Sequence, residues 1–281
     1  MSIQFILILT KAPIMNIIDL GNKVYYECFE TTFNSYVDRI DFKDLVYHYT
    51  TQSKLGMILD SKELWLSHIM DMNDPLELYF GIDVIIDILS PRFPKKSIIP
   101  KILQEGIYRL HYFNSVVEEK PIFVSSFSEL PDDLKQWIHY ANNGLGVNIE
   151  FVRKHLVSSV KANIDSRTAN LLLPVHYFYY SSKKRIFAET IHFEDMIYNF
   201  FKNIDDLLLR EGITVERNEI NMIFDYAILF AMFIKQGLYE QEKEWRLVIK
   251  TGLNLKHIKT KIQNDVAQMK YVTFPLFSVK Q

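Results

Sequence analysis

Two glutamates and an arginine stand at alternate positions in EQEKEWRLVIK, residues 240–250. Residues two apart share one face of a β-strand, so Glu242, Glu244 and Arg246 would line a single face. The opposite face becomes fully apolar after Lys243, as a core-facing surface should. The charged face is therefore either a wetted ladder of ion pairs or the wall of a site. In a site, its carboxylates would stabilise a developing positive charge or accept a proton.

A second candidate is His48 in the stretch YHYT, residues 47–50. An imidazole that is hydrogen-bonded through one ring nitrogen presents the other nitrogen to a ligand hydroxyl. The alternative is a structural histidine, and this segment alone favours that alternative, because the spacing is not decisive.

A third candidate is FVSSFSE, residues 123–129, in which Ser126 and Ser128 share a strand face opposite Phe127. Such a strand end offers hydroxyls to a phosphate or a ribose and an aromatic ring for stacking. No Gly-x-Ser-x-Gly turn surrounds these serines, which argues against a serine hydrolase.

The common metal and nucleotide motifs are missing from the sequence. It has no Cys pair, no His-Glu-x-x-His helix, no Walker A loop and no Gly-x-Gly-x-x-Gly fingerprint. No two of the 8 histidines stand four residues apart. We therefore expect no metal cofactor.

The segments that must position these side chains alternate irregularly between strand-like and helix-like patterns. The predicted strands are residues 45–49, 63–67, 121–128, 144–151, 172–180, 242–250 and 270–277. The predicted helices are residues 52–59, 76–89, 98–117, 132–141, 189–209 and 216–235. This irregular mixture predicts an α+β fold and argues against a regular βαβ repeat.

The composition fits one globular domain over residues 1–281, since no linker, repeat or low-complexity segment divides the chain. A net charge of −2 supplies no global field for nucleic acid or a membrane surface. The single cysteine, Cys28, favours a reducing compartment and hence a cytoplasmic protein. The apolar run Ile3–Leu9 is too short to cross a bilayer, which needs about 18 or more apolar residues.

Separated motifs follow one another in an order that is not arbitrary. They are Tyr-His-Tyr-Thr (47–50), Asn-Asp-Pro-Leu-Glu (73–77), Ser-Phe-Ser-Glu (126–129), Trp137 with Tyr140 before a Gly-rich stop, and Glu-x-Glu-Trp-Arg (242–246). This order resembles a large bacterial family known only as a domain of unknown function, with the likeness covering residues 44–250. On that likeness, residues 1–43 are an N-terminal extension and residues 251–281 are a C-terminal segment.

That family in turn looks like the ADP-ribosyltransferase fold, which implies a mixed-sheet core with inserted helices and NAD as a substrate. The resemblance places His48 with Tyr49 and Thr50 at the adenosine-side ribose. It implies a nicotinamide pocket at a second group of residues: Ser126, Phe127, Ser128 and Tyr140. Phe127 or Tyr140 would stack on the nicotinamide ring.

The resemblance puts Glu244 in the catalytic place. Cleavage of the nicotinamide–ribose bond passes through an oxocarbenium-like state, which a fixed carboxylate stabilises. Glu242 would orient or deprotonate the acceptor nucleophile.

The leading hypothesis is an NAD-dependent ADP-ribosyltransferase or NAD glycohydrolase. It would act on a macromolecular acceptor, protein or nucleic acid, as a toxin or anti-phage defence effector with an antitoxin or regulatory partner. The alternative is a non-catalytic nucleotide or NAD sensor, or a protein-interaction module. A third hypothesis is a nuclease or phosphate-transfer enzyme that uses His48 and the later Lys and Arg residues.

Overall fold

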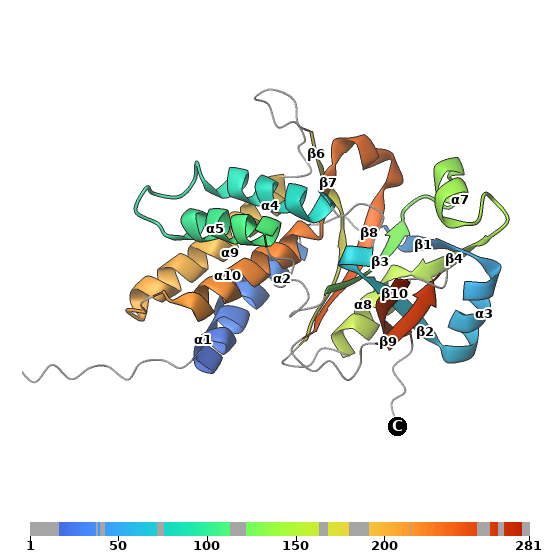
Figure 1. Cartoon of the computed structure of the whole chain (residues 1–281), viewed down its shortest axis with the longest axis horizontal. Helices are drawn as coiled ribbons and strands as arrows, with labels where there is room; N and C mark the ends of the chain where they lie inside the picture. The colour runs from blue at the N-terminus through green and yellow to red at the C-terminus, as the bar shows by residue number, and fades with distance from the viewer. Residues whose placement is uncertain are drawn as a thin grey trace, which may run out of the picture.

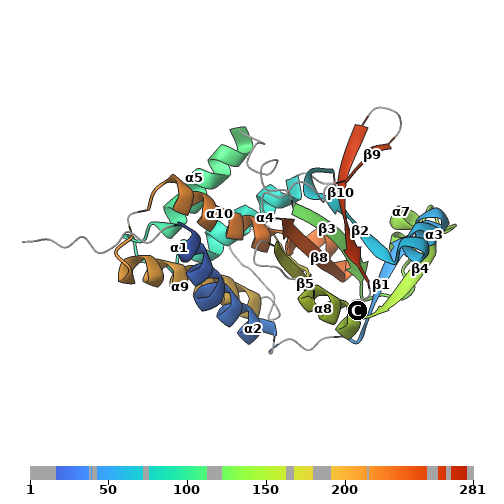
Figure 2. The same cartoon turned by 90° about the horizontal axis from the view of Figure 1, so that it is seen from below.

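A helical half packs against a sheet half in this computed structural model (Figures 1 and 2). It describes residues 17–37, 39, 43–71, 76–112, 122–162, 168–179, 191–213, 215–251, 259–263 and 267–276. Helices and mostly antiparallel strands are mixed along the chain, which confirms the predicted α+β class. No helix in the described part of the chain combines the length and apolarity needed to cross a bilayer.

The helical half gathers segments that lie far apart in the sequence around one apolar core. Its members are α1 (Ile17–Lys23), the π-helix η1 (Val24–Glu30), α2 (Thr31–Val37), α4 (Leu76–Leu89), α5 (Ile99–Tyr112), α9 (Ile191–Arg210) and α10 (Arg217–Ala231). In α9, Phe193, Ile197, Phe200 and Ile204 recur at helical spacing and are fully buried. This helix therefore turns one continuous apolar face to the core.

The sheet half is built on one branched antiparallel sheet. Its strands are β1 (Leu45–Thr50), β2 (Glu63–His68), β3 (Ile122–Ser128), β4 (Val147–Val152), β5 (Thr168–Pro174), β8 (Glu244–Thr251), β9 (Lys259–Gln263) and β10 (Ala267–Pro275). The order along one path is β4-β1-β3-β2-β10-β9, and β8 lies between β3 and β5. The short elements around it are α3 (Gln52–Ser61), η2 (Ile69–Asp71), α7 (Leu134–Tyr140), α8 (Arg153–Ala162) and η4 (Gly237–Glu242).

Strand β8 separates two apolar clusters formed by the buried described residues. Val248 faces the first cluster, whose residues come mostly from the helical half. Trp245, Leu247 and Ile249 face the second cluster, beneath the sheet. The strand is buried on both faces, so its side chains either are apolar or must find charge partners inside the protein.

The predicted extension over residues 1–43 looks different in its described part. Helices α1, η1 and α2 run on continuously, and Leu20, Val24 and Cys28 are buried in the helical core. Burial raises the pKa of the Cys28 thiol to about 12, which keeps it protonated. This segment therefore belongs to the core of the helical half.

Two predicted elements are divided in the structure. The strand predicted over 172–180 ends at Pro174, and β6 (His176–Phe178) then pairs in parallel with β7 (Ile234–Gln236) in a separate small sheet. Proline has no N–H group with which to continue the ladder. The helix predicted over 216–235 ends at Ala231 and gives way to β7.

Helices α4 and α10 approach so closely that one contact requires glycine. A β-carbon at Gly81 would lie 2.7 Å from the Ala231 carbonyl oxygen and 2.8 Å from its Cβ. Backbone atoms cannot move aside as a flexible side chain can, so added volume here forces the helices apart.

We predict that Gly81→Ala lowers the free energy of unfolding by about 1–3 kcal/mol, measured by urea denaturation. The matched control is Gly56→Ala in α3, where nothing lies within 4 Å of the added carbon. That variant should be neutral or stabilised by up to about 1 kcal/mol. Equal effects of the two substitutions would contradict the close approach.

Candidate functional site

The charged stretch that begins β8 does not follow strand alternation at its first member. Glu242 is the last residue of η4, and Lys243 adopts a left-handed conformation with φ 44°. The strand starts at Glu244. The prediction that Glu242 and Glu244 share one strand face is therefore wrong, because the chain turns between them.

Glu244 and Arg246 form a buried ion pair at the start of β8. Arg246 Nε lies 2.8 Å from one oxygen of the Glu244 carboxylate, and Nη2 lies 3.0 Å from the other. The remaining terminal nitrogen donates to the Met232 carbonyl at 2.8 Å and also contacts the Glu77 carboxylate. Only 6% of Glu244 and 1% of Arg246 is exposed, which excludes the wetted surface ladder.

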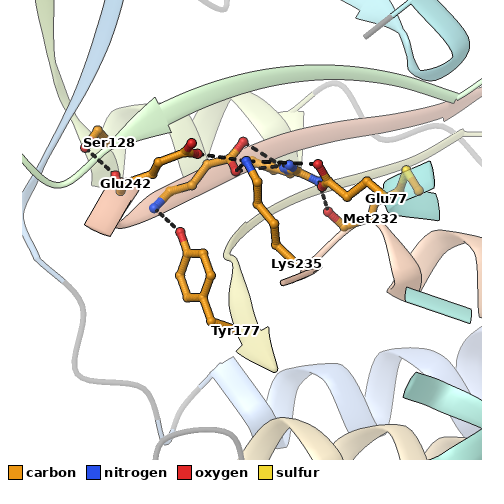
Figure 3. A network of polar contacts seen from close by, with 8 residues as sticks. Glu77, Ser128, Tyr177, Met232, Lys235 and Glu242 are labelled. Atoms are coloured by element: carbon orange, nitrogen blue, oxygen red, sulfur yellow. Dashed lines mark hydrogen bonds and ion pairs between the residues drawn. The ribbon is translucent and has the colours of Figure 1, made fainter. Parts of the chain in front are cut away.

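Lys235 extends this pair into a cluster (Figure 3). Its ammonium lies 2.7 Å from Glu242, 3.1 Å from Glu244 and 4.0 Å from Glu77. These residues come from four elements: Glu77 from α4, Lys235 from β7, Glu242 from η4, and Glu244 and Arg246 from β8. We call these five residues the ion cluster. It joins the helical half to the sheet.

Neutral groups lock the start of β8 in place. The Glu244 backbone N–H donates to the Tyr177 hydroxyl at 2.9 Å (Figure 3). The Ser128 hydroxyl donates to the Glu242 carbonyl at 2.7 Å, and the Trp245 indole donates to Glu129 at 2.8 Å. The carboxylates therefore project from a fixed backbone.

The two carboxylates of this stretch differ in charge environment. Burial alone would raise the pKa of Glu244, but Arg246 and Lys235 outweigh it and lower that pKa to about 2. For Glu242 burial prevails over Lys235, and its pKa is raised from the ordinary value. Glu242 has an 18% exposed side chain, against 6% for Glu244, so it is the more accessible of the two.

Strands β1 and β2 both pair with one edge of β3, and together they leave part of that edge unpaired. Toward its end, Ser128 pairs with Tyr47 of β1, and toward its start, Val124 pairs with Ser67 of β2. Strands β1 and β2 diverge between these points, which leaves residues 125–127 between them. This divergence opens a space at the middle of the sheet.

His48 closes part of the opened edge. Its Nδ1 lies 2.9 Å from the Ser126 carbonyl oxygen. Because a carbonyl can only accept, Nδ1 carries the proton, and Nε2 of the neutral ring is left as an acceptor. Burial lowers the pKa of His48 from its ordinary value, against the opposing effect of this hydrogen bond. His48 is thus a neutral ring fixed in one tautomer.

A pocket of about 550 Å³ occupies the space between β1 and β2, within the 300–1,000 Å³ typical of ligand sites. The predicted site residues that line it are His48, Tyr49, Thr50, Ser126, Phe127, Tyr140, Glu242 and Glu244. Strands β1, β3 and β8 thus bring distant motifs to one cavity. Ser128 is not among the lining residues; its hydroxyl donates to the Glu242 carbonyl and accepts from the Leu130 N–H.

Two residues that were predicted to contact a ligand, Phe127 and Tyr49, make contacts within the protein instead. Phe127 is only 3% exposed, and its ring packs against His48 and Phe151 in the second apolar cluster. The Tyr49 hydroxyl donates to the Leu130 carbonyl at 2.8 Å and accepts from the Asp133 N–H at 3.1 Å. Tyr140, by contrast, is 41% exposed at the pocket.

The structure adds lining residues that motif analysis did not assign to the site. They are Tyr47, Lys54, Met57, Ile58, Leu64, Trp65, Ser67, Asp71, Glu77, Val124, Ser125, Gln136, Lys235, Tyr239, Arg246 and Tyr271. Glu77 ends the Asn-Asp-Pro-Leu-Glu motif, whose first three residues lie outside the described part of the chain. Trp65 could have been found from the sequence. In a strand it lies on the face opposite Leu64 and Leu66, which are buried, so a large aromatic ring is expected on the outer face. Among the described residues, no three His, Cys, Asp or Glu side chains gather to hold a metal ion.

Comparison with known proteins gives one family match. The family model described as "Protein of unknown function (DUF2971)" matches residues 136–247. No curated protein and no solved structure matches the chain. The matched range runs from α7 into β8 and includes Lys235 and the Glu-x-Glu stretch. It supports the likeness to a domain of unknown function, while the likeness to ADP-ribosyltransferases stays a prediction.

We predict that Arg246→Met lowers the free energy of unfolding by about 3–5 kcal/mol, because it leaves Glu244 and Glu77 buried without their main cation. The matched control is Arg210→Met, which removes an arginine that is paired with Glu27 on the surface, where its side chain is 59% exposed. That change should cost about 0–1 kcal/mol. Chemical denaturation of both variants measures the difference, and similar costs would contradict a buried cluster.

The lowered pKa of Glu244 predicts an acid dependence of stability. A carboxylate whose pKa is lower in the folded than in the unfolded state stabilises the protein above the unfolded value, about 4.3. That stabilisation is lost as the pH falls toward 2, and it is on the order of 3 kcal/mol. The stability gap between wild type and Glu244→Gln should therefore narrow between pH 5 and pH 2. A gap that stays constant over that range would refute the depressed pKa.

Proposed function

We propose that the protein transfers ADP-ribose from NAD to a macromolecular acceptor. The observation that carries this proposal is the convergence of His48, Ser126, Glu242 and Glu244 on one pocket of ligand size. These residues come from strands and turns far apart in the chain, and the divergence of β1 and β2 makes room for a ligand between them. The resemblance of the motifs to ADP-ribosyltransferases supplies the choice of NAD.

The reaction requires two catalytic functions from the protein: stabilisation of a developing positive charge and acceptance of a proton. The bond between ribose C1′ and nicotinamide breaks, and its electron pair goes to the nicotinamide nitrogen, which becomes neutral. C1′ then bonds to the nucleophilic atom of the acceptor, and the proton of that atom goes to a base. Negative charge near C1′ stabilises the oxocarbenium-like state, and a carboxylate serves as the base.

The geometry distinguishes the two glutamates as candidates for these functions. Three nitrogen contacts from Arg246 and Lys235 engage both oxygens of Glu244, so its charge is largely neutralised. Glu242 contacts Lys235 through one oxygen and is the more accessible carboxylate. We assign the proton-accepting role to Glu242 and treat Glu244 as the residue that holds Lys235 and Arg246 in position. The Nε2 acceptor of His48 suits a ribose hydroxyl.

One observation favours a second candidate, a protein that binds NAD or a nucleotide without chemistry. A carboxylate already paired with two cations offers little net charge to a developing cation. A pocket that retains the recognition groups with a neutralised Glu244 fits a sensor or an interaction module. Binding and turnover must therefore be measured separately.

We predict that the wild-type protein, incubated with NAD and a bacterial lysate as the source of acceptors, releases nicotinamide. Glu242→Gln should lower the rate about 10²–10⁴-fold, because it removes the base and keeps the side-chain shape. Glu240→Gln is the matched control, since it removes a carboxylate from the same η4 segment that contacts Tyr179 and Lys243 outside the ion cluster.

The outcomes separate the two candidates. Retained activity in the Glu240 variant together with loss in the Glu242 variant supports ADP-ribosyl transfer. NAD binding by calorimetry without nicotinamide release from wild type supports the binding module. Nicotinamide release that is equal in Glu242→Gln and wild type would remove Glu242 from the mechanism.

A further inference from the structure

An aromatic pair lines the pocket away from the predicted motifs. The rings of Trp65 on β2 and Tyr271 on β10 are stacked, with centroids 4.6 Å apart and planes at 19°. Both residues line the same cavity as His48 and Glu242. Neither belongs to the motifs that suggested NAD.

The strand register places this pair on the same face of the sheet as the ion cluster. Tyr271 pairs with Ser67, and Ser67 pairs with Val124, so these three side chains point the same way. Trp65 follows the same alternation two residues before Ser67, and Ser126 follows it two residues after Val124. Ser126 pairs with Arg246. A ligand on this face therefore meets aromatic rings and the carboxylate cluster together.

The strands that carry Trp65 and Tyr271 are held in place by the apolar core. Leu64 and Leu66, on either side of Trp65, are fully buried in the second apolar cluster. Val272 and Phe274 fix β10 in the same way beside Tyr271. Rings that are fixed before binding lose little conformational freedom when a ligand stacks on them. Rigid aromatic surfaces at a polar cavity are suited to planar heterocycles.

We propose that Trp65 and Tyr271 form a stacking platform for the planar nitrogen heterocycle of a ribose-linked ligand. The heterocycle then lies on the β2–β10 side of the pocket, with the ribose toward the ion cluster and His48. Phe127, whose ring is covered in the core, does not supply the stack. The inference rests on the proposed function only for the ligand class. Its heterocycle comes either from a pyridine nucleotide or from an adenine nucleotide.

Intrinsic fluorescence tests the platform without any turnover. The chain has 3 tryptophans, of which Trp245 is buried and Trp137 is not among the described pocket-lining residues. The probes are nicotinamide mononucleotide, AMP and ribose 5-phosphate, titrated into wild type, Trp65→Phe, Trp65→Leu and Tyr271→Leu. The matched control is Trp137→Leu, which removes an indole from outside the cavity.

We expect at least one of the two mononucleotides to quench wild-type fluorescence, and the one that quenches identifies the source of the heterocycle. Ribose 5-phosphate should not quench. Trp65→Phe should lose the quench while it still binds by calorimetry, and Trp65→Leu or Tyr271→Leu should bind about five- to hundredfold more weakly. Trp137→Leu should keep wild-type affinity.

Unchanged mononucleotide affinity in both leucine variants would overturn the platform, and so would a quench by ribose 5-phosphate equal to that of the mononucleotides. Binding of a mononucleotide requires no bond cleavage, so the platform stands even if the wild type releases no nicotinamide. Conversely, nicotinamide release with an unchanged KM in Trp65→Leu would overturn the platform and leave the proposed function intact.

Discussion

The buried guanidinium of Arg246 is the constraint on which the rest of the site depends. A charge with 1% exposure is tolerated only where partners surround it, and no single element supplies them all. Helix α4 gives Glu77, the end of α10 gives the Met232 carbonyl, and β8 gives Glu244. Contacts from the helical half therefore help to pair this charge where the two halves meet. Helix α10 ends at Ala231, and the carbonyl of the next residue, Met232, accepts a hydrogen bond from Arg246.

The pocket arises from a different constraint: β1 and β2 both pair with the same edge of β3. Strands β1 and β2 both run antiparallel to β3 on the side opposite β8, and neither can pair along its whole length. Their divergence leaves the Ser126 carbonyl without a ladder partner, and a buried carbonyl needs a donor. His48 provides that donor, so the residue that satisfies the backbone also lines the pocket. Structure and recognition are therefore coupled at this histidine.

Sequence patterns predicted the parts of this arrangement that depend on local periodicity. From Glu244 onward the alternation of β8 is as predicted, with Trp245 and Leu247 in one core and Arg246 on the other face. The prediction failed at Glu242. The chain turns at Lys243, which has a left-handed backbone conformation, and no glycine stands there to indicate a turn in the sequence. Motif order placed His48 and Glu244 together but could not assign Trp65 and Tyr271, whose meeting depends on the long-range pairing of β2 with β10. Partner identity within the ion cluster is likewise a property of tertiary packing.

The charge balance of the ion cluster bears on the kind of ligand that suits this pocket. Three carboxylates, Glu77, Glu242 and Glu244, face two cations, Lys235 and Arg246, which leaves one negative charge when all five are ionised. In a partly buried site that excess is costly unless a cation approaches or a proton binds. Burial, which raises the pKa of Glu242, likewise favours its protonated form. A pyridinium ring brings a positive charge to such a site and leaves as a neutral molecule. Under the proposed function, binding of the substrate therefore relieves the imbalance. Loss of nicotinamide restores it at the moment when Glu242 must accept a proton.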